Sequence, residues 1–462
     1  MRTRSVLAAS LLLALASGVS FAANTPTDAQ GADWRDQWRA DRNALVERNP
    51  RLAYDPTSLL VQFRPGAGKD AIAAAKAAAG VIADPIETWK LLPGVEHLAV
   101  ERGVRVEEAL KVLAASPIVE YAEPDHIANL HANPNDTYYG LLYGMNNTGQ
   151  TVNGVVGVAN ADIDANLAWD LTTGSSSVVV GMADSGIRKT HEDLAANIWT
   201  NPGEIAGNNV DDDGNGRVDD TWGWDFYNND KDPTDDNGHG THTSGTVGAV
   251  GNNAKGVAGV CWTVRLAGLK IGSRQGSISL SAAIASVDYC VGKGIKVSNH
   301  SWGGPSFNTT LNNAITNARN AGHMLVCSAG NGGSDGVGDN NDAVAQYPAN
   351  YTQDNIISVA AIDNRNLLAS FSNYGVTTVD IGAPGVNTAS CGRQSNSNYV
   401  YMSGTSMAAP HVTGVCALVW ARNPTWTYAQ VRSRVLTTAK PVTALNGKCA
   451  TGGCVNANNA VQ

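Results

Sequence analysis

The sequence predicts two folded units: a small α+β unit, followed by a large α/β domain with a mainly parallel sheet. The chain has 462 residues, too many for one typical domain. From about residue 133 onward, short apolar runs alternate with helical segments. This alternation indicates a parallel sheet covered by helices on both faces, a three-layer α/β/α domain. In such a sheet, catalytic residues are expected at the carboxyl ends of the strands.

The N-terminal residues indicate export. Two arginines precede an apolar run from Val6 to Ala16, and small residues at Ser20 and Ala22 occupy the positions that a signal peptidase reads. The run is too short to span a bilayer, so residues 1–22 are predicted to be a secretory signal peptide. No later stretch is long and apolar enough to cross a membrane, and the protein is therefore expected to be secreted.

The small α+β unit is expected at residues 55–131, after a polar segment, residues 23–54, that is interpreted as a linker. Its elements follow from apolar alternation for strands and helical spacing for helices. They are expected as strands at 59–63, 95–100 and 119–123, the last with the alternation of an edge strand, and as helices at 69–79 and 106–113. No catalytic constellation falls within this unit.

The large domain is expected to cover residues 132–462. Its strands are predicted from apolar runs at 178–183, 264–271, 295–299, 324–328 and 356–361. Its helices are predicted at 281–291, 311–321 and 428–438, between or after these runs. The order of the segments is that of a doubly covered parallel sheet.

The net charge excludes some classes of partner, and the cysteines indicate one disulfide and two buried thiols. A net charge of −9 argues against nucleic acid or an anionic membrane as a partner. The seven cysteines suit an exported protein that can form disulfides, and the short loop between Cys449 and Cys454 predicts one such bond. Cys327 and Cys416 lie in apolar runs and are interpreted as buried thiols.

A serine stands at the start of the last apolar segment, in the stretch from Gly404 to Val412. Pro410 is compatible with a helix's first turn, so Ser406 is placed at a junction between a loop and a helix. Unpaired N–H groups and the helix dipole at that end favour developing negative charge. Ser406 is therefore a candidate nucleophile.

Two further motifs supply the groups that a serine nucleophile needs. Asp184 ends a predicted strand, and His239 stands in a His-Gly-Thr-His block that opens a helix of small residues. Imidazole can accept the serine proton, and a carboxylate fixes its tautomer and stabilises the imidazolium. Position alone does not distinguish His239 from His242 as the base. A zinc site is rejected because His239-x-x-His242 lacks the intervening glutamate of zinc-protease helices.

With three motifs in the order Asp, His and Ser, residues 133–462 resemble a subtilisin-like serine protease. The preceding unit resembles the inhibitor-like, ferredoxin-like propeptide of that family. The resemblance implies that Asp184 orients the base, that His239 is the general base and acid, and that Ser406 is the nucleophile. It also implies an acyl-enzyme intermediate, and protein or peptide substrates for a monomeric endopeptidase.

The resemblance extends to an oxyanion donor and a substrate cleft. Asn331, in the block from Cys327 to Gly332, corresponds to the family's side-chain donor to the oxyanion. The substrate is expected to pair with the segment that begins at Ser301, and Gln346 to floor the S1 pocket. The expected substrate-binding residues are Ser301, Trp302, Gly303, Ser328, Ala329, Gly330 and Gln346. The family usually places a smaller aliphatic residue where Trp302 stands.

Calcium is the expected cofactor. Between positions 211 and 236 there are ten aspartates, and oxygen side chains alternate around Gly214 as hard cations require. The expected ligands in this loop are Asp211, Asp213, Asn215, Asp219 and Asp220. The loop looks like the first part of an EF-hand, but Trp222 stands where the terminal glutamate would be. The resemblance implies a second calcium site, formed by Asp136, Asp193 and Asn253.

Two other interpretations remain at this level. An α/β-hydrolase esterase needs a second glycine after the serine and a histidine later in the chain, but here Ala408 and only His411 are present. A non-catalytic relative that binds peptides or calcium is disfavoured by the intact catalytic positions.

The family's zymogen mechanism further implies that the propeptide inhibits the enzyme, aids its folding and is cut autocatalytically between Ile127 and Asn133.

Overall fold

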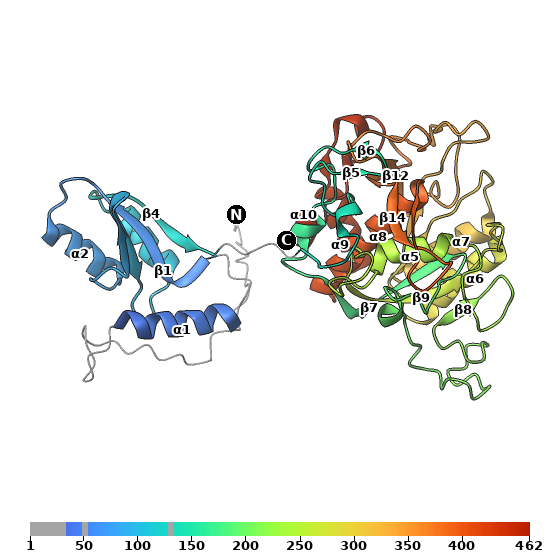
Figure 1. Ribbon diagram of the computed structural model, residues 1–462, viewed down its shortest axis with the longest axis horizontal. Coiled ribbons are helices and arrows are strands. Elements are labelled where there is room, and N and C mark those ends of the chain that lie inside the picture. The colour runs from blue at the N-terminus through green and yellow to red at the C-terminus, as the bar shows by residue number, and fades with distance from the viewer. Residues whose placement is uncertain (1–33, 49–53, 128–132) are drawn as a thin grey trace, which may run out of the picture. The chain divides into compact units, whose positions relative to one another are not determined.

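The computed structural model describes residues 34–48, 54–127 and 133–462, and it separates the chain into two compact units at residues 130 and 131 (Figure 1). The predicted signal peptide, residues 1–22, lies outside the described residues, as do residues 128–132 of the expected cleavage segment. Within the described ranges, no helix is both long and apolar enough to cross a bilayer.

The N-terminal unit contains a four-stranded antiparallel sheet in the order β2-β3-β1-β4. Its elements are β1 (Tyr54–Phe63), α2 (Lys69–Ala79), β2 (Glu87–Trp89), β3 (Leu92–Ala99), α3 (Val106–Ala114) and β4 (Val119–His126). This succession and strand order are those of the ferredoxin-like fold. Helices α2 and α3 pack on one face, where Leu59, Val61 and Leu98 are fully buried. The predicted edge position of β4 is confirmed.

A further helix, α1 (Trp34–Arg48), occupies much of the segment interpreted as a linker, so that interpretation is wrong for these residues. Trp38 is buried against Ile86 and Ala99. Because Ala99 follows Leu98 in the same strand, α1 packs on the face opposite to α2 and α3. Arg42 Nε also donates to a buried carboxylate of β1, Asp55 Oδ2, at 2.7 Å. The sequence did not predict this helix because most of its residues are polar and only two tryptophans supply its apolar packing.

The large unit is built on a nine-stranded sheet in the order β16-β17-β13-β12-β11-β10-β7-β9-β8. All neighbouring pairs are parallel except β16 with β17. The strands are β7 (Gly174–Asp184), β8 (Gly223–Asp225), β9 (Thr263–Lys270), β10 (Val297–His300), β11 (Met324–Ser328), β12 (Ile356–Ile362), β13 (Ile381–Pro384), β16 (Lys440–Pro441) and β17 (Gly453–Cys454). The mainly parallel sheet expected from the sequence is confirmed.

Helices cover both faces of this sheet. They are α4 (Ala165–Ala168), α5 (His239–Gly248), α6 (Leu280–Gly292), α7 (Thr309–Asn320), α8 (Thr405–Arg422), α9 (Tyr428–Thr437) and α10 (Ala457–Val461). Helix α8 is buried from Met407 to Trp420 and packs across β7 and β10–β13, with α5 beside it. On the other face, α6 contributes to one apolar cluster and, together with α7, to a second. Two small hairpins complete the unit, β5 (Thr151–Val152) with β6 (Val155–Val156), and β14 (Thr388–Cys391) with β15 (Tyr399–Met402).

All seven cysteines lie in the described part of this unit, and all are free, buried thiols. The predicted Cys449–Cys454 disulfide is therefore not formed in the structure. Cys454 is fixed within β17, which pairs with both β13 and β16. Cys449 Sγ contacts the carbonyl oxygen of Gly453, at 3.9 Å, and is not bonded to the sulfur of Cys454. The interpretation of Cys327 and Cys416 as buried thiols is confirmed.

Candidate active site

The three predicted catalytic side chains come from three elements at the carboxyl edge of the sheet. Asp184 is the last residue of β7, and His239 is the first residue of α5. Ser406 is the second residue of α8, which runs back across the face of the sheet. The placement of Ser406 at a junction between loop and helix agrees with the prediction.

Asp184 and His239 form a direct pair. His239 Nδ1 lies 2.7 Å from Asp184 Oδ1, and the same oxygen accepts a 2.7 Å hydrogen bond from the backbone N–H of Ser185. Thr243 Oγ1 donates to the other carboxylate oxygen at 3.1 Å. Burial favours the neutral imidazole, but the charge and hydrogen bond of Asp184 outweigh burial and raise the pKa of His239 above its ordinary value. The arrangement fixes the tautomer that leaves Nε2 as a proton acceptor.

His242, the other histidine of the block, does not have this environment. It is fully buried, and its Nε2 lies 2.9 Å from the carbonyl oxygen of Thr388. Burial lowers the pKa of His242 to about 3, so the ring stays neutral and structural. His411 is also buried and hydrogen-bonds through Nδ1 to the carbonyl of Met407 in its own helix, at 2.8 Å. Neither histidine is placed to serve as a general base, which argues against the esterase interpretation.

Asp235 positions the helix that begins at His239, and the sequence interpretation missed it. Its carboxylate accepts from the backbone N–H groups of Asn237, Gly238 and Thr241 at 2.8–2.9 Å, and from the hydroxyl of Ser185 at 2.9 Å. Asp235 thus satisfies N–H groups at the start of α5 that have no partner within the helix. The available signal was an aspartate four residues before His239, but it was grouped with the acidic stretch assigned to cations.

Ser406 is locked to the segment that follows β10. Its hydroxyl donates to the carbonyl of Ser301 at 3.1 Å, and the hydroxyl of Ser301 donates to the carbonyl of Ser406 at 2.8 Å. Asn299 Nδ2 in turn donates to Ser301 Oγ at 2.9 Å. The contacts described for Ser406 Oγ therefore join it to the expected substrate segment, while Asp184 and His239 are joined to each other.

Asn331 has the orientation that an oxyanion donor needs. Its Oδ1 accepts from both the backbone N–H and the hydroxyl of Thr405, each at 2.8 Å, which leaves Nδ2 as the outward-facing donor. A Cβ atom built on Gly404 would lie 3.4 Å from Asn331 Nδ2 and 3.6 Å from the backbone nitrogen of Ser406. Two N–H donors therefore flank one small space beside Ser406, and Gly404 leaves that space open.

The expected substrate segments lie around Gln346. Gly304 and Tyr347 exchange backbone hydrogen bonds of 2.8 and 2.9 Å, which joins the segment after β10 to the segment that carries Gln346. A Cβ on Gly330 would lie 3.2 Å from Gln346 Cγ, and one on Gly303 would lie 3.9 Å from Gln346 Oε1. Gln346 therefore lies between the two glycine-containing segments.

The remaining expected substrate residues occupy different environments. Ser328 and Ala329, which end β11 and follow it, are buried. Trp302 is half-buried and contacts the apolar clusters of both α6 and α7, with its ring 5.8 Å from that of His300. Trp302 therefore packs between these two clusters at the edge of the expected substrate segment.

The structure brings together the calcium set that the resemblance implies, Asp136, Asp193 and Asn253. Asn253 Nδ2 donates to Asp193 Oδ1 at 2.9 Å, and Asp136 Oδ2 accepts from the backbone N–H of Asn252 at 2.6 Å. Asp136 Oδ1 is buried and has no hydrogen-bond partner among the described residues. Burial raises the pKa of Asp136, with a further contribution from the charge of Asp193. An unpartnered carboxylate oxygen beside a second buried carboxylate fits a hard cation.

The acidic loop forms a second group, with a membership that differs from the prediction. Carboxylate oxygens of Glu204, Asp213 and Asp220 lie within 4.8 Å of one another, and Glu204 was not among the expected ligands. Asn215 Oδ1 is buried and has no hydrogen-bond partner in the described ranges, which fits a ligand oxygen. Lys293 Nζ contacts Asp213 and lies 3.6 Å from Asp220 Oδ2, so part of the negative charge is already compensated.

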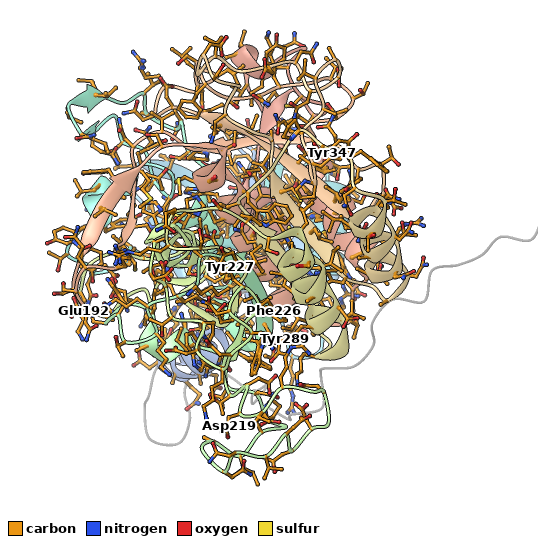
Figure 2. All side chains as sticks on the ribbon, turned by 90° about the vertical axis from the view of Figure 1, so that its right-hand side faces the viewer. Glu192, Asp219, Phe226, Tyr227, Tyr289 and Tyr347 are labelled. Carbon is orange, nitrogen blue, oxygen red and sulfur yellow. The ribbon has the colours of Figure 1, made fainter. Side chains whose placement is uncertain are left out.

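Asp211 and Asp219 are not brought into this group. Asp211 accepts from the backbone N–H groups of Asn215 and Gly216, and Asp219 pairs with Lys231 at 2.7 Å. Figure 2 shows the loop that carries Asp219 at the lower end of the view, beneath Phe226 and Tyr289. Tyr289 Oη lies 2.5 Å from Asp220 Oδ2 and so ties this loop to α6.

At one edge of the sheet, the imidazole of His239 pairs with a buried carboxylate, and Ser406 lies beside two N–H donors. This combination of groups is typical of a serine hydrolase. A family model described as the subtilase family matches residues 175–454, and one described as the fervidolysin N-terminal prodomain matches residues 40–125. The chain belongs to the subtilase family: it is a subtilisin-like serine protease with an N-terminal prodomain.

Individual relatives agree with this assignment. The chain is 37% identical over 357 residues to a thermophilic serine proteinase of Bacillus sp. (strain AK1), which covers 77% of this chain and 76% of that protein. It is 34% identical over 300 residues to thermitase of Thermoactinomyces vulgaris, across 65% of this chain and 94% of that protein. A solved protease from Pseudoalteromonas arctica PAMC 21717 superposes with a TM-score of 0.57 at 28% identity, covering 71% of this chain and 99% of the other.

Proposed function

We propose that the protein is a secreted, calcium-stabilised endopeptidase that cleaves peptide bonds through Asp184, His239 and Ser406. The 2.7 Å pair between Asp184 and His239 is the observation that carries this proposal. His239 Nε2 accepts the proton of Ser406 as Oγ attacks the peptide carbonyl, and the backbone N–H of Ser406 and Asn331 Nδ2 stabilise the oxyanion. His239 then gives the proton to the leaving amine, and water hydrolyses the acyl-enzyme by the same route.

The substrate is held as an extended strand. Ser301, Trp302 and Gly303 form one wall of the proposed cleft, and Ser328, Ala329 and Gly330 form the other. Backbone pairing along these walls would give affinity, and a side-chain pocket would give specificity. Because Gln346 lies between Gly303 and Gly330, it shortens the S1 pocket and presents an amide there. Medium-sized or polar P1 residues are therefore favoured over phenylalanine.

Calcium contributes stability rather than chemistry. Asp136, Asp193 and Asn253 would hold one ion, which would compensate two buried carboxylates, and Asp136 Oδ1 has no hydrogen-bond partner among the described residues. Glu204, Asp213, Asn215 and Asp220 would hold a second ion, with Asp211 and Asp219 shaping the loop through its backbone. Binding to the folded state alone raises stability by linkage.

Maturation is proposed to be autocatalytic. The prodomain would act as an intramolecular inhibitor and folding aid, with cleavage between Ile127 and Asn133, a segment that lies mostly outside the described residues. Cleavage before Asp136 keeps this ligand on the mature chain. The mature enzyme is proposed to act as a monomer on protein or peptide substrates.

One pair of variants tests the proposal. Ser406→Ala should accumulate as the uncut precursor and should not react with a sulfonyl fluoride, whereas the wild type should be trimmed and labelled at Ser406. Ser403→Ala, an exposed serine three positions earlier, serves as the matched control and should behave as the wild type. Full activity in Ser406→Ala, or trimming to the same N-terminus in a protease-free expression system, would contradict the assignment.

A further inference from the structure

Strand β15, which leads to Ser406, begins at the cation site proposed for Asp136, Asp193 and Asn253. β15 starts at Tyr399 and leads through Gly404 into α8, where Ser406 is the second residue. Tyr399 Oη lies 2.8 Å from Asp193 Oδ2, so the first residue of this strand is bonded to one of the buried carboxylates. Seven positions of chain thus separate a contact with the cation site from the reacting hydroxyl.

The ring of Tyr399 is held firmly in place. A Cβ atom on Gly256 would lie 1.9 Å from its Cζ, so the phenol rests directly on the backbone of the loop that follows Asn253. The rings of Tyr138 and His191 pack edge-on against it, with centroids 5.2 and 5.1 Å away. With its ring confined in this way, the hydroxyl has little freedom to leave Asp193 while β15 keeps its position.

The hydroxyl has two acidic neighbours but only one proton. Glu192 Oε1 lies 3.1 Å from Tyr399 Oη, farther than Asp193 Oδ2, and Glu192 is labelled at the edge of the unit in Figure 2. The shorter distance assigns the hydrogen bond to Asp193. That carboxylate also accepts from Asn253 Nδ2 at 2.9 Å and from the N–H of Val257 at 2.8 Å, so Tyr399 shares this acceptor with the loop that contains Asn253 and Val257.

The hairpin formed by β14 and β15 also touches the helix of the general base. The carbonyl of Thr388 pairs with His242 Nε2 at 2.9 Å, and Ser390 Oγ donates to the carbonyl of His242 at 2.7 Å. One hairpin therefore contacts the cation site at Tyr399, supports α5 through β14, and continues into the nucleophile. A displacement at its Tyr399 end would reach both halves of the catalytic apparatus.

We propose that Tyr399 is a positioning residue that couples the order of the Asp136–Asp193 site to the alignment of Ser406. When Asp193 is held in place, its hydrogen bond fixes the start of β15 and with it the approach to Gly404. When Asp136 and Asp193 face each other uncompensated, their repulsion displaces Asp193 and releases the phenol. The inference rests on the proposed function, because it assumes both the calcium site and a reactive Ser406.

The test measures Ser406 reactivity and fold stability on the same samples. The mature enzyme is titrated with calcium from a chelated state, and at each point the rate of labelling by diisopropyl fluorophosphate and the midpoint of thermal unfolding are recorded. In the wild type both should rise over the same calcium range, with labelling at least fivefold faster at saturation. In Tyr399→Phe the unfolding midpoint should still rise with calcium, while labelling should stay at the slow chelated rate.

Two controls separate coupling from general damage. Tyr401→Phe, an exposed tyrosine two positions along the same strand, should behave as the wild type. Glu192→Gln should also keep the calcium response, because Asp193 retains the hydrogen bond. Tyr399→Phe labelling that follows calcium as in the wild type would overturn the proposal, as would wild-type labelling that is insensitive to calcium.

A measurement on the unmodified protein covers the case in which Tyr399→Phe does not fold. Amide exchange of residues 399–404 should slow when calcium is added to the chelated enzyme, and unchanged exchange there would overturn the coupling. A failure of the proposed function looks different, because wild-type Ser406 would then not be labelled at any calcium concentration.

Discussion

Asn331 offers the sharpest test of the proposed oxyanion site, because its two polar side-chain atoms have separate roles. Nδ2 faces the space beside Ser406, whereas Oδ1 accepts two 2.8 Å hydrogen bonds from Thr405. Asn331→Ala removes both functions. Asn331→Asp keeps the acceptor oxygen in nearly the same shape but removes the donor and places a negative charge where the oxyanion develops. The two variants should therefore differ in stability while both lose activity.

The expected magnitudes follow from these contacts. A hydrogen bond to a charged group contributes about 1.5–3 kcal/mol, which is about 10- to 150-fold in kcat. Pre-organised donors in water-excluded sites reach about 10²–10³, a range taken from the corresponding donor of subtilisin. We expect kcat of Asn331→Ala to fall about 100-fold with KM almost unchanged, and that of Asn331→Asp to fall further. Asn331→Ala should also lose about 1–3 kcal/mol of unfolding free energy, because buried Thr405 loses two acceptor contacts.

Steady-state kinetics on a chromogenic peptide and calorimetric unfolding measure these effects on the same preparations. A kcat within threefold of the wild type in both variants would refute the role of Asn331. Equal destabilisation by alanine and aspartate would refute the separate role of Oδ1.

Four further predictions follow. Asp184→Asn removes the charge that contributes most to raising the pKa of His239, while burial, which lowers this pKa, and the smaller contribution of Asp235 remain; the acidic limb of the rate profile should move to lower pH while kcat falls about 10⁴-fold, and an unmoved limb would contradict this. Asp235→Ala should cost about 2 kcal/mol or more of unfolding free energy and lower kcat, since several N–H groups at the start of α5 lose their acceptor; an unchanged unfolding curve would argue against it. Calcium at a hundredfold excess over Kd should add about 2.7 kcal/mol to the stability of the mature enzyme, and equal inactivation half-lives with calcium and with chelator would count against the site. Gln346→Gly should broaden P1 preference toward phenylalanine and tyrosine in a peptide library, whereas a dominant aromatic preference in the wild type would show that Gln346 does not shorten the pocket.

Features that depend on local sequence were predictable. Asp184, His239 and Ser406 each sit in a block whose neighbours set the local backbone, and the sheet was evident from apolar runs such as β11 and β12. The small α+β unit was likewise predicted from alternation and helical spacing, and its edge strand was assigned correctly; its ferredoxin-like topology was expected from the family resemblance.

Features that depend on tertiary contacts were not predictable in the same way. Asp235 resembles its acidic neighbours in sequence and differs only because its carboxylate meets the start of α5. Glu204 lies outside the aspartate run and joins Asp213 and Asp220 only through folding of the loop. Helix α1 was missed because two tryptophans and Arg42, rather than a broad apolar face, attach it to the sheet.

The packing of α8 has a consequence for when activity can arise. This helix carries Ser406 and crosses β7 and β10–β13, strands drawn from residues 174–384. Ser406, the proposed nucleophile, therefore cannot take its place until segments far apart in the chain have assembled, and such long-range pairing is slow. A partly folded chain contains Ser406 but does not yet hold it in the site, so we expect hydrolytic activity only after these strands have assembled. The need to complete the fold thus protects the chain from digesting itself. Folding intermediates expose cleavable backbone, but they do not yet have an assembled site that could cleave it.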